Sequence, residues 1–212
     1  MIVHEKIQID NYDEIVLNVH ADVFYQQISQ DKPFLQISVD ENILPSIDIH
    51  VKNNRLIISQ NNDSVLKPSQ FKIYTNSRSI SKVKIISSGN FYMEKEVNAG
   101  NMEIHISGAG DVKTDSLYCK DLKLTISGAG DMEIKGAANH AEFHISGSGN
   151  INAFDYLINK LDCSINGSGD INAFVSENLN ASISGSGDLK YKGNPEKVTS
   201  HVSGSGSIHK IN

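Results

Sequence analysis

Four aspartates recur in the second half of the chain, each directly after a glycine. They are Asp111, Asp131, Asp170 and Asp188. Stacked glycine turns with carboxylates hold Ca²⁺ between the coils of β-rolls, so this column is a candidate calcium site. However, one carboxylate per repeat gives a single column, which is a poor source of the roughly seven oxygen ligands that calcium takes. We therefore expect no metal and no cofactor at these positions.

Three histidines, His105, His144 and His201, share one position of the same repeat and point outward if the segment is a strand. Thr125 occupies that position between the first two, which places them about 9.6 Å apart at two strand spacings. This separation is too large for one metal ion. The histidines are therefore predicted to be surface residues.

The cysteines and arginines do not form a catalytic pattern. Cys163 falls on an inward position and Cys119 in a predicted connecting loop, so we expect two isolated thiols rather than a disulfide. Catalytic β-helices cluster Asp, Lys and Arg on one face, whereas the only arginines here, Arg55 and Arg78, both precede the repeats. We expect no enzymatic activity.

Composition limits the class of protein. The chain has 212 residues, a formal net charge of −6 and no cluster of Lys and Arg, so nucleic acid is not an expected partner. No run approaches the ~20 apolar residues of a membrane helix, so no membrane span is expected in this chain. Residues 1–6 do not begin a secretory signal with an apolar core, and we see no leader.

The pattern Ser-Gly-x-Gly-Asp repeats along residues 107–207. Its copies start 18 to 20 residues apart, at Ser107, Ser127, Ser146, Asn166, Ser184 and Ser203. A degenerate copy precedes them at 87–90. Such a period with short strands is typical of a solenoid.

Hydrophobic residues alternate with polar ones before each copy, which predicts a strand with one buried face. The position just before each copy is always a branched aliphatic residue: Ile86, Ile106, Ile126, Ile145, Ile165, Ile183 and Val202. A second short strand follows each corner, and variable connections such as 115–120 and 155–160 complete the coil. This is an all-β, parallel β-helix with coils of about 19–20 residues. We expect it to be right-handed because left-handed coils favour strict six-residue repeats.

The repeated glycines are predicted to be structural. A sharp corner requires positive φ or close packing that a Cβ would obstruct. These turn glycines are Gly108, Gly110, Gly128, Gly130, Gly147, Gly149, Gly167, Gly169, Gly185, Gly187, Gly204 and Gly206. The short polar residue after each corner is expected to bond the local backbone.

Residues 1–86 lack the glycine pattern but alternate as strands do, at 15–19, 35–39, 56–58 and 83–85. A solenoid needs a covered end, so this region is predicted to supply irregular early coils and a cap. We expect one domain, residues 1–212, with regular Gly-x-Gly-Asp coils at 87–212. The last coil, near Ile208 and Ile211, offers an open end through which copies of the chain could associate.

The Ser-Gly-Ser-Gly-Asp-Ile unit, preceded by an alternating strand and by a non-repetitive β region, resembles the GIN-domain family, the auto-transporter adhesin head domain of Bacteroidetes. The resemblance covers essentially the whole chain and is strongest over 86–212. It implies a right-handed β-helix, a signal or lipoprotein leader, and an adhesin role in the periplasm or at the cell surface of a bacterium.

Three functions follow as hypotheses. The first is an exported, non-enzymatic adhesin-like module that binds a glycan or a surface protein through an extended surface. The second is a carbohydrate-active β-helix enzyme, which predicts a groove with clustered carboxylates and basic residues. The third is a structural envelope spacer. Exposed rows of aromatic residues favour binding, whereas uniformly polar faces favour the spacer.

Overall fold

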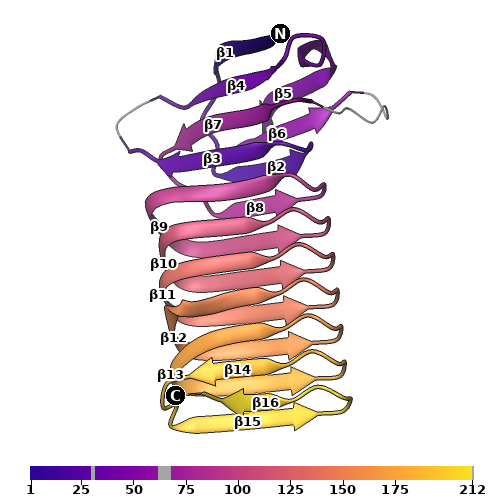
Figure 1. Ribbon diagram of the computed structural model, residues 1–212. Coiled ribbons are helices and arrows are strands. Elements are labelled where there is room, and N and C mark those ends of the chain that lie inside the picture. The colour runs from indigo at the N-terminus through magenta and orange to yellow at the C-terminus, as the bar shows by residue number, and fades with distance from the viewer. Residues whose placement is uncertain (30–31, 62–67, 212) are drawn as a thin grey trace.

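The computed structural model describes residues 1–29, 32–61 and 68–211, which form an elongated β-solenoid (Figure 1). Sixteen strands are hydrogen-bonded into one sheet that wraps around the core. The described residues contain no α-helix, only the 3₁₀ turn Leu44–Ser46. The predicted all-β solenoid is confirmed, and its right-handed sense stays a prediction.

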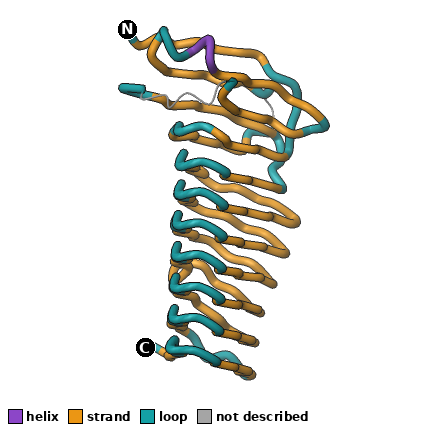
Figure 2. Tube along the Cα trace, turned by 90° about the vertical axis from the view of Figure 1, so that its right-hand side faces the viewer, coloured by secondary structure: helices purple, strands orange, loops and turns teal. Residues whose placement is uncertain are grey.

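The regular coils stack parallel strands in register. Each long strand starts after a corner, runs along one face, bends, and returns along the opposite face to the next corner, so the corners form one column (Figure 2). These long strands are β9 (Asn90–Ile106), β10 (Val112–Ile126), β11 (Met132–Ile145), β12 (Ile151–Ile165) and β13 (Ile171–Ile183). The last coils consist of the short strands β14 (Leu189–Lys192), β15 (Lys197–Val202) and β16 (Ile208–Lys210), of which β14 and β15 stack on the two halves of β13.

The predicted variable connections are not loops. Residues 115–120 lie within β10 and residues 155–160 within β12, so Cys119 also lies in a strand. Register shifts, for example between Lys113 and Leu117, absorb the difference in coil length. A bulge accommodates an extra residue while most ladder hydrogen bonds persist, which explains why the strand continues through the bend.

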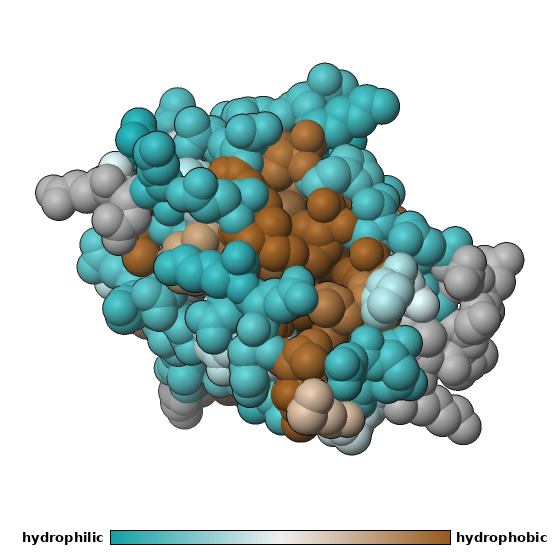
Figure 3. Space-filling model, turned by 90° about the horizontal axis from the view of Figure 1, so that it is seen from above, coloured by the Kyte–Doolittle hydropathy of each residue, from teal (hydrophilic) through white to brown (hydrophobic). Residues whose placement is uncertain are grey.

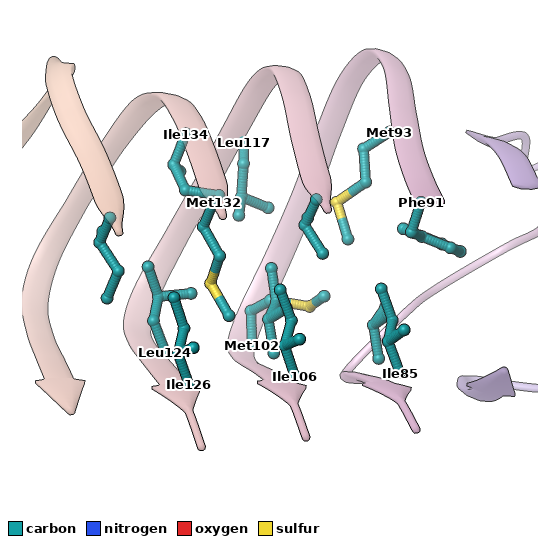
Figure 4. Close-up of a cluster of buried hydrophobic side chains, with 14 of the residues drawn as sticks. Ile85, Phe91, Met93, Met102, Ile106, Leu117, Leu124, Ile126, Met132 and Ile134 are labelled. Carbon is teal, nitrogen blue, oxygen red and sulfur yellow. The ribbon is translucent and has the colours of Figure 1, made fainter. Parts of the chain in front are cut away.

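The interior is a set of columns of hydrophobic side chains, mostly aliphatic with some aromatic residues and methionines (Figure 4). The column before each corner is buried from Ile106 to Ile183. The degenerate copy is displaced by one residue from the prediction, because Ile85 pairs with Ile106 while Ile86 is 41% exposed. Val202 is also 41% exposed, since the structure has no further coil beneath it.

Close stacking, rather than positive φ, accounts for the corner glycines. Positive-φ glycines are Gly136 and Gly193, both outside the corners, so the positive-φ interpretation is wrong for a corner such as Gly169. A Cβ on Gly169 would overlap the carbonyl oxygen of Gly149 in the preceding coil. The corner needs glycine because backbone packs directly on backbone.

The N-terminal region contributes two coils whose spatial order differs from their chain order. One coil consists of β2 (Glu14–Asn18) and β3 (Asp22–Gln27), and the other of β6 (Arg55–Gln60) and β7 (Phe71–Ser77). β2 pairs in parallel with β6 and with β8 (Lys82–Ile85), and β3 pairs in parallel with β7 and β9. The earlier coil therefore lies between two later segments.

Antiparallel strands extend the two faces at the N-terminal end. They are β1 (Ile2–Gln8) and β4 (Phe34–Asp40), which continue the β7 face, and β5 (Ile47–Lys52), which continues the β6 face. The four strands predicted in 1–86 are confirmed. One core cluster extends from Tyr12 to Leu189, which supports the proposal that the chain is a single domain.

Apolar side chains remain visible between the two faces at this end (Figure 3). The partly buried hydrophobic residues of β1 and β5 that pack against the core are Val3, Ile7, Ile47, Ile49 and Val51, and we call them the apolar strip. They point inward from β1 and β5, whose outer edges have no strand paired to them among the described residues. The cap is thus a splayed pair of sheet ends over the core.

Candidate functional site

The aspartate column lies at the corners and bonds the backbone. Asp111 Oδ1 accepts from the N–H of Asp131 at 2.9 Å, and Asp131 Oδ1 accepts from the N–H of Asn150 at 2.7 Å. The same contact continues through Asp170 and Asp188. Each side chain therefore satisfies a backbone donor of the next coil, which explains why short polar residues recur there.

Several features bear on the calcium hypothesis. Within the described part of the chain, no three His, Cys, Asp or Glu residues are grouped closely enough to hold a metal ion. The hydroxyl of Ser207 donates to Asp188 Oδ1 at 2.6 Å and lowers the pKa of that carboxyl. The column oxygens thus already serve as hydrogen-bond acceptors.

His144, one member of the histidine column, lines a shallow groove on the face formed by the second halves of β10–β13. Its volume is about 430 Å³, and Lys123, Glu142, His144, Asp162 and Ser164 are among the residues that line it. His140 Nε2 lies 3.0 Å from Asp162 and lowers the pKa of that carboxyl. Mixed charges and hydroxyls make this face hydrophilic, without a concentration of one charge.

Both cysteines are free thiols. Cys163 is buried, and burial raises its pKa to about 12. Cys119 is half-buried, with its Sγ 3.2 Å from the hydroxyl of Tyr156, and burial raises its pKa as well. Thiols with raised pKa values are weak nucleophiles, because the thiolate is the reactive form.

Three aromatic side chains form an outward row that the sequence analysis missed. The ring of Phe24 on β3 stacks between Tyr74 on β7 and Tyr92 on β9, with centroids 4.9 Å apart on both sides. This distance matches the strand spacing, as expected for side chains at one position of adjacent strands. Tyr74 is 37% exposed. We call Phe24, Tyr74 and Tyr92 the aromatic ladder.

A small cavity lies at the end of the aromatic ladder that faces the cap. It has a volume of about 220 Å³ and is lined by Phe24 and Tyr74 together with Phe34 and Gln36 of β4. Gln36 is the register partner of Tyr74 across the antiparallel β4–β7 pair. The cavity thus lies where the parallel coils meet the antiparallel cap.

The sequence contained a weak signal for this ladder. The dipeptide Phe-Tyr occurs at 24–25 and 91–92, with the first pair placing Tyr25 in the core and Phe24 outside. However, the spatial order Tyr74, Phe24, Tyr92 arises because β3 pairs with both β7 and β9. No repeat in the sequence predicts this pairing. Sequence alternation predicted inward and outward sides but not these neighbours.

The fold defines the class, a parallel β-solenoid with extended outer faces, here carrying an outward-facing aromatic ladder. The chain belongs to the family described as "Putative auto-transporter adhesin, head GIN domain", whose model matches residues 11–195. The protein is therefore an adhesin-like module, and this membership indicates an extracellular or cell-surface protein. No curated protein matches the chain.

Solved structures agree with this assignment. A "putative adhesin" from Bacteroides fragilis is 28% identical with a TM-score of 0.96, over 100% of this chain and 97% of that one. A "putative lipid binding protein" from Parabacteroides distasonis is 32% identical with a TM-score of 0.82, over 100% and 97%. A "putative adhesin" from Parabacteroides merdae is 26% identical with a TM-score of 0.82, over 100% and 96%.

Proposed function

We propose that the protein is a non-catalytic adhesin-like module that binds a glycan or a surface protein through its extended outer face. The observation that supports this proposal is the aromatic ladder. Stacked rings held at the surface present apolar area at low entropic cost, and aromatic residues are enriched at binding sites. A spacer needs no such row, because polar outer faces suffice to keep a solenoid soluble.

Two carboxylates on the outer faces lack the raised pKa that a catalytic acid needs. A glycosidase needs a carboxylic acid with a raised pKa to protonate the leaving group. Here Lys113 lowers the pKa of Glu133, and His140 lowers that of Asp162. Both side chains are ionised at neutral pH and lie in ion pairs on the surface, where they are suited to hydrogen bonding rather than acid catalysis.

In this proposal the module binds its partner in the periplasm or at the cell surface of a bacterium. Family membership supports this location, because the family is defined by an adhesin head domain. No helix of the described residues is long and apolar enough to cross a membrane. The proposed partners are accordingly glycans or proteins met outside the cytoplasm.

A lipid is a second candidate ligand, favoured by the apolar strip at the cap (Figure 3). A relative that is 32% identical is described as a "putative lipid binding protein". Addition of palmitate to the binding screen tests this candidate. Ile49→Asn, which places an amide in the apolar strip, should then reduce palmitate binding, whereas Tyr74→Ala should not.

The main experiment is a screen of the purified chain against glycans and bacterial or host surface proteins, with and without calcium, with affinity and thermal shift as readouts. We expect saturable binding that is weakened at least tenfold by Tyr74→Ala. Tyr118→Ala is the matched control, because Tyr118 is similarly exposed at 42% but lies outside the aromatic ladder. Absence of binding in all conditions would favour the spacer.

A further inference from the structure

The cavity beside Tyr74 contains an unusual buried donor. Asn76 lines this cavity and is 1% exposed. Its Oδ1 accepts from the N–H of Phe34 at 2.9 Å, but its Nδ2 has no hydrogen-bond partner. Among the described residues it is the single buried side-chain nitrogen or oxygen atom in that state. Buried polar groups are almost always paired, so this amide is suited to an acceptor supplied by a ligand.

The walls of the cavity are amphipathic. The rings of Phe24, Phe34 and Tyr74 provide apolar surface. The Gln36 amide and the Tyr74 hydroxyl make no hydrogen bond within the described structure and remain available at the cavity. A pyranose ring has the matching chemistry, since its C–H face is apolar and its edge carries hydroxyl groups that donate and accept.

The charge of the lining favours a neutral ligand. Glu94 is the one charged residue that lines the cavity, and it already accepts from Gln26 Nε2 at 2.7 Å. Two lysines contact residues of the lining: Lys95 Nζ donates to Gln26 Oε1 at 3.1 Å, and Lys6 Nζ lies over the Phe34 ring. An anionic sugar would meet the Glu94 carboxylate, whereas a neutral hydroxyl can donate to it.

The size of the cavity limits the ligand to one ring. Its volume of about 220 Å³ is below the roughly 300–1,000 Å³ of pockets that hold drug-sized ligands. A single sugar residue is the appropriate scale, and further residues of a glycan would extend outward past Tyr74. The neutral sugar substituent that supplies a strong acceptor is the carbonyl of an acetamido group.

We infer that this cavity is a subsite for one N-acetylhexosamine residue, which displaces the side chains that enclose Asn76 Nδ2, so that its acetamido carbonyl accepts from this atom and its ring lies against Tyr74. This inference rests on the proposed glycan-binding function and assigns the site and the sugar class. Asn76 and Tyr74 are the specificity-determining residues. Gln36 and Glu94 bind the ring hydroxyls.

The test is a titration followed by ¹H–¹⁵N NMR, with N-acetylglucosamine, N-acetylgalactosamine and N-acetylmannosamine as probes. Glucose and glucuronate serve as sugars without an acetamido group. We expect a saturable shift of the Asn76 side-chain amide with at least one N-acetylhexosamine, and at least tenfold weaker binding of glucose and glucuronate. Tyr74→Ala should reduce the affinity at least tenfold, and Tyr118→Ala should leave it unchanged.

Two variants address the donor itself. Asn76→Asp keeps the acceptor for the Phe34 N–H but removes the Nδ2 donor, so the preference for the acetamido group over glucose should disappear. If this variant does not fold, as judged by circular dichroism, Gln36→Ala at the cavity rim should still weaken N-acetylhexosamine binding without affecting the melting temperature.

The possible failures are distinguishable. Equal binding of glucose, shifts confined to other amides, or binding unaffected by Tyr74→Ala would overturn this subsite. If none of the three N-acetylhexosamines binds, the subsite is also overturned, but the proposed function stands as long as the broad screen finds a ligand. If no ligand binds in either experiment, the proposed function is overturned as well.

Discussion

The regular coils and the N-terminal region both stack parallel strands on one another, but they differ in which residues become neighbours. In the coils, equivalent positions of the repeat lie on one another, as when Ile145 lies on Ile165. In the N-terminal region, the coil of β2 and β3 lies between β6 and β7 on one side and β8 and the start of β9 on the other, so different side chains meet. Repetition produces uniform faces, whereas its interruption produces the aromatic ladder.

Polar groups show the same contrast. In the coils, the corner carboxylates pair with backbone donors of the next coil, as Asp111 does with the N–H of Asp131. At the junction with the cap, Asn76 Nδ2 has no partner. Saturated hydrogen bonding favours stability, whereas a buried donor without a partner lowers stability and creates capacity for a ligand. The comparison therefore agrees with the proposal that the coils supply stability and the junction supplies the ligand site.

The largest expected effect comes from Gly169→Val. Its Cβ would overlap the backbone oxygen of Gly149, which cannot rotate away, so we expect a loss of about 3 kcal/mol from overpacking. For a chain of this size that corresponds to a fall in Tm of about 6–12 °C, measured by circular dichroism. Gly100→Val is the control, because a Cβ there meets nothing within 4 Å. Equal effects of the two variants would contradict the stacking explanation.

A smaller effect is expected from Asp131→Ala. The variant leaves the N–H of Asn150 without its side-chain acceptor, which should cost about 1 kcal/mol and lower Tm by about 2–4 °C. Asp131→Asn retains Oδ1 as an acceptor and should unfold close to the wild type. If the Asn variant lost as much stability as the Ala variant, charge rather than the hydrogen bond would explain why aspartate recurs in the column.

The pH dependence of the Tm should reveal the contribution of the same aspartate column, with a still smaller effect. Because the Ser207 hydroxyl lowers the folded-state pKa of Asp188, its contribution is full above the unfolded pKa of about 3.9. It is lost as the pH falls through the lower folded value. Tm measured from pH 5 to strongly acidic conditions should therefore fall less steeply in Asp188→Asn than in the wild type. Parallel curves would exclude this contribution.

Calcium should have no effect on the coils. The corner oxygens of Asp111 and Asp131 already accept backbone hydrogen bonds, and one carboxylate per coil is a poor ligand set. Millimolar calcium should leave Tm equal to that measured with a chelator. A saturable rise that disappears in Asp131→Asn would establish a calcium site and would place a ligand-binding function on the regular coils.

The sequence was informative wherever a position repeats. Period-two alternation and the glycine pattern predicted the coils, the inward column from Ile106 to Ile183, and strands in the N-terminal region. It was less informative where the period breaks. Ile85 rather than Ile86 is buried in the degenerate copy, because hydrogen-bond register with Ile106 decides which neighbour faces the core.

The sequence by itself determined the solenoid, because backbone stacking at a corner requires glycine and a buried column requires aliphatic residues at every turn. Only the tertiary structure decided that β7 lies above β3, which brings Tyr74 onto Phe24 although the two are far apart in the chain. Alternation specifies which side of a strand is buried but not which strand lies beside it. The candidate site consists of such neighbours, so it emerged only when the chain was folded.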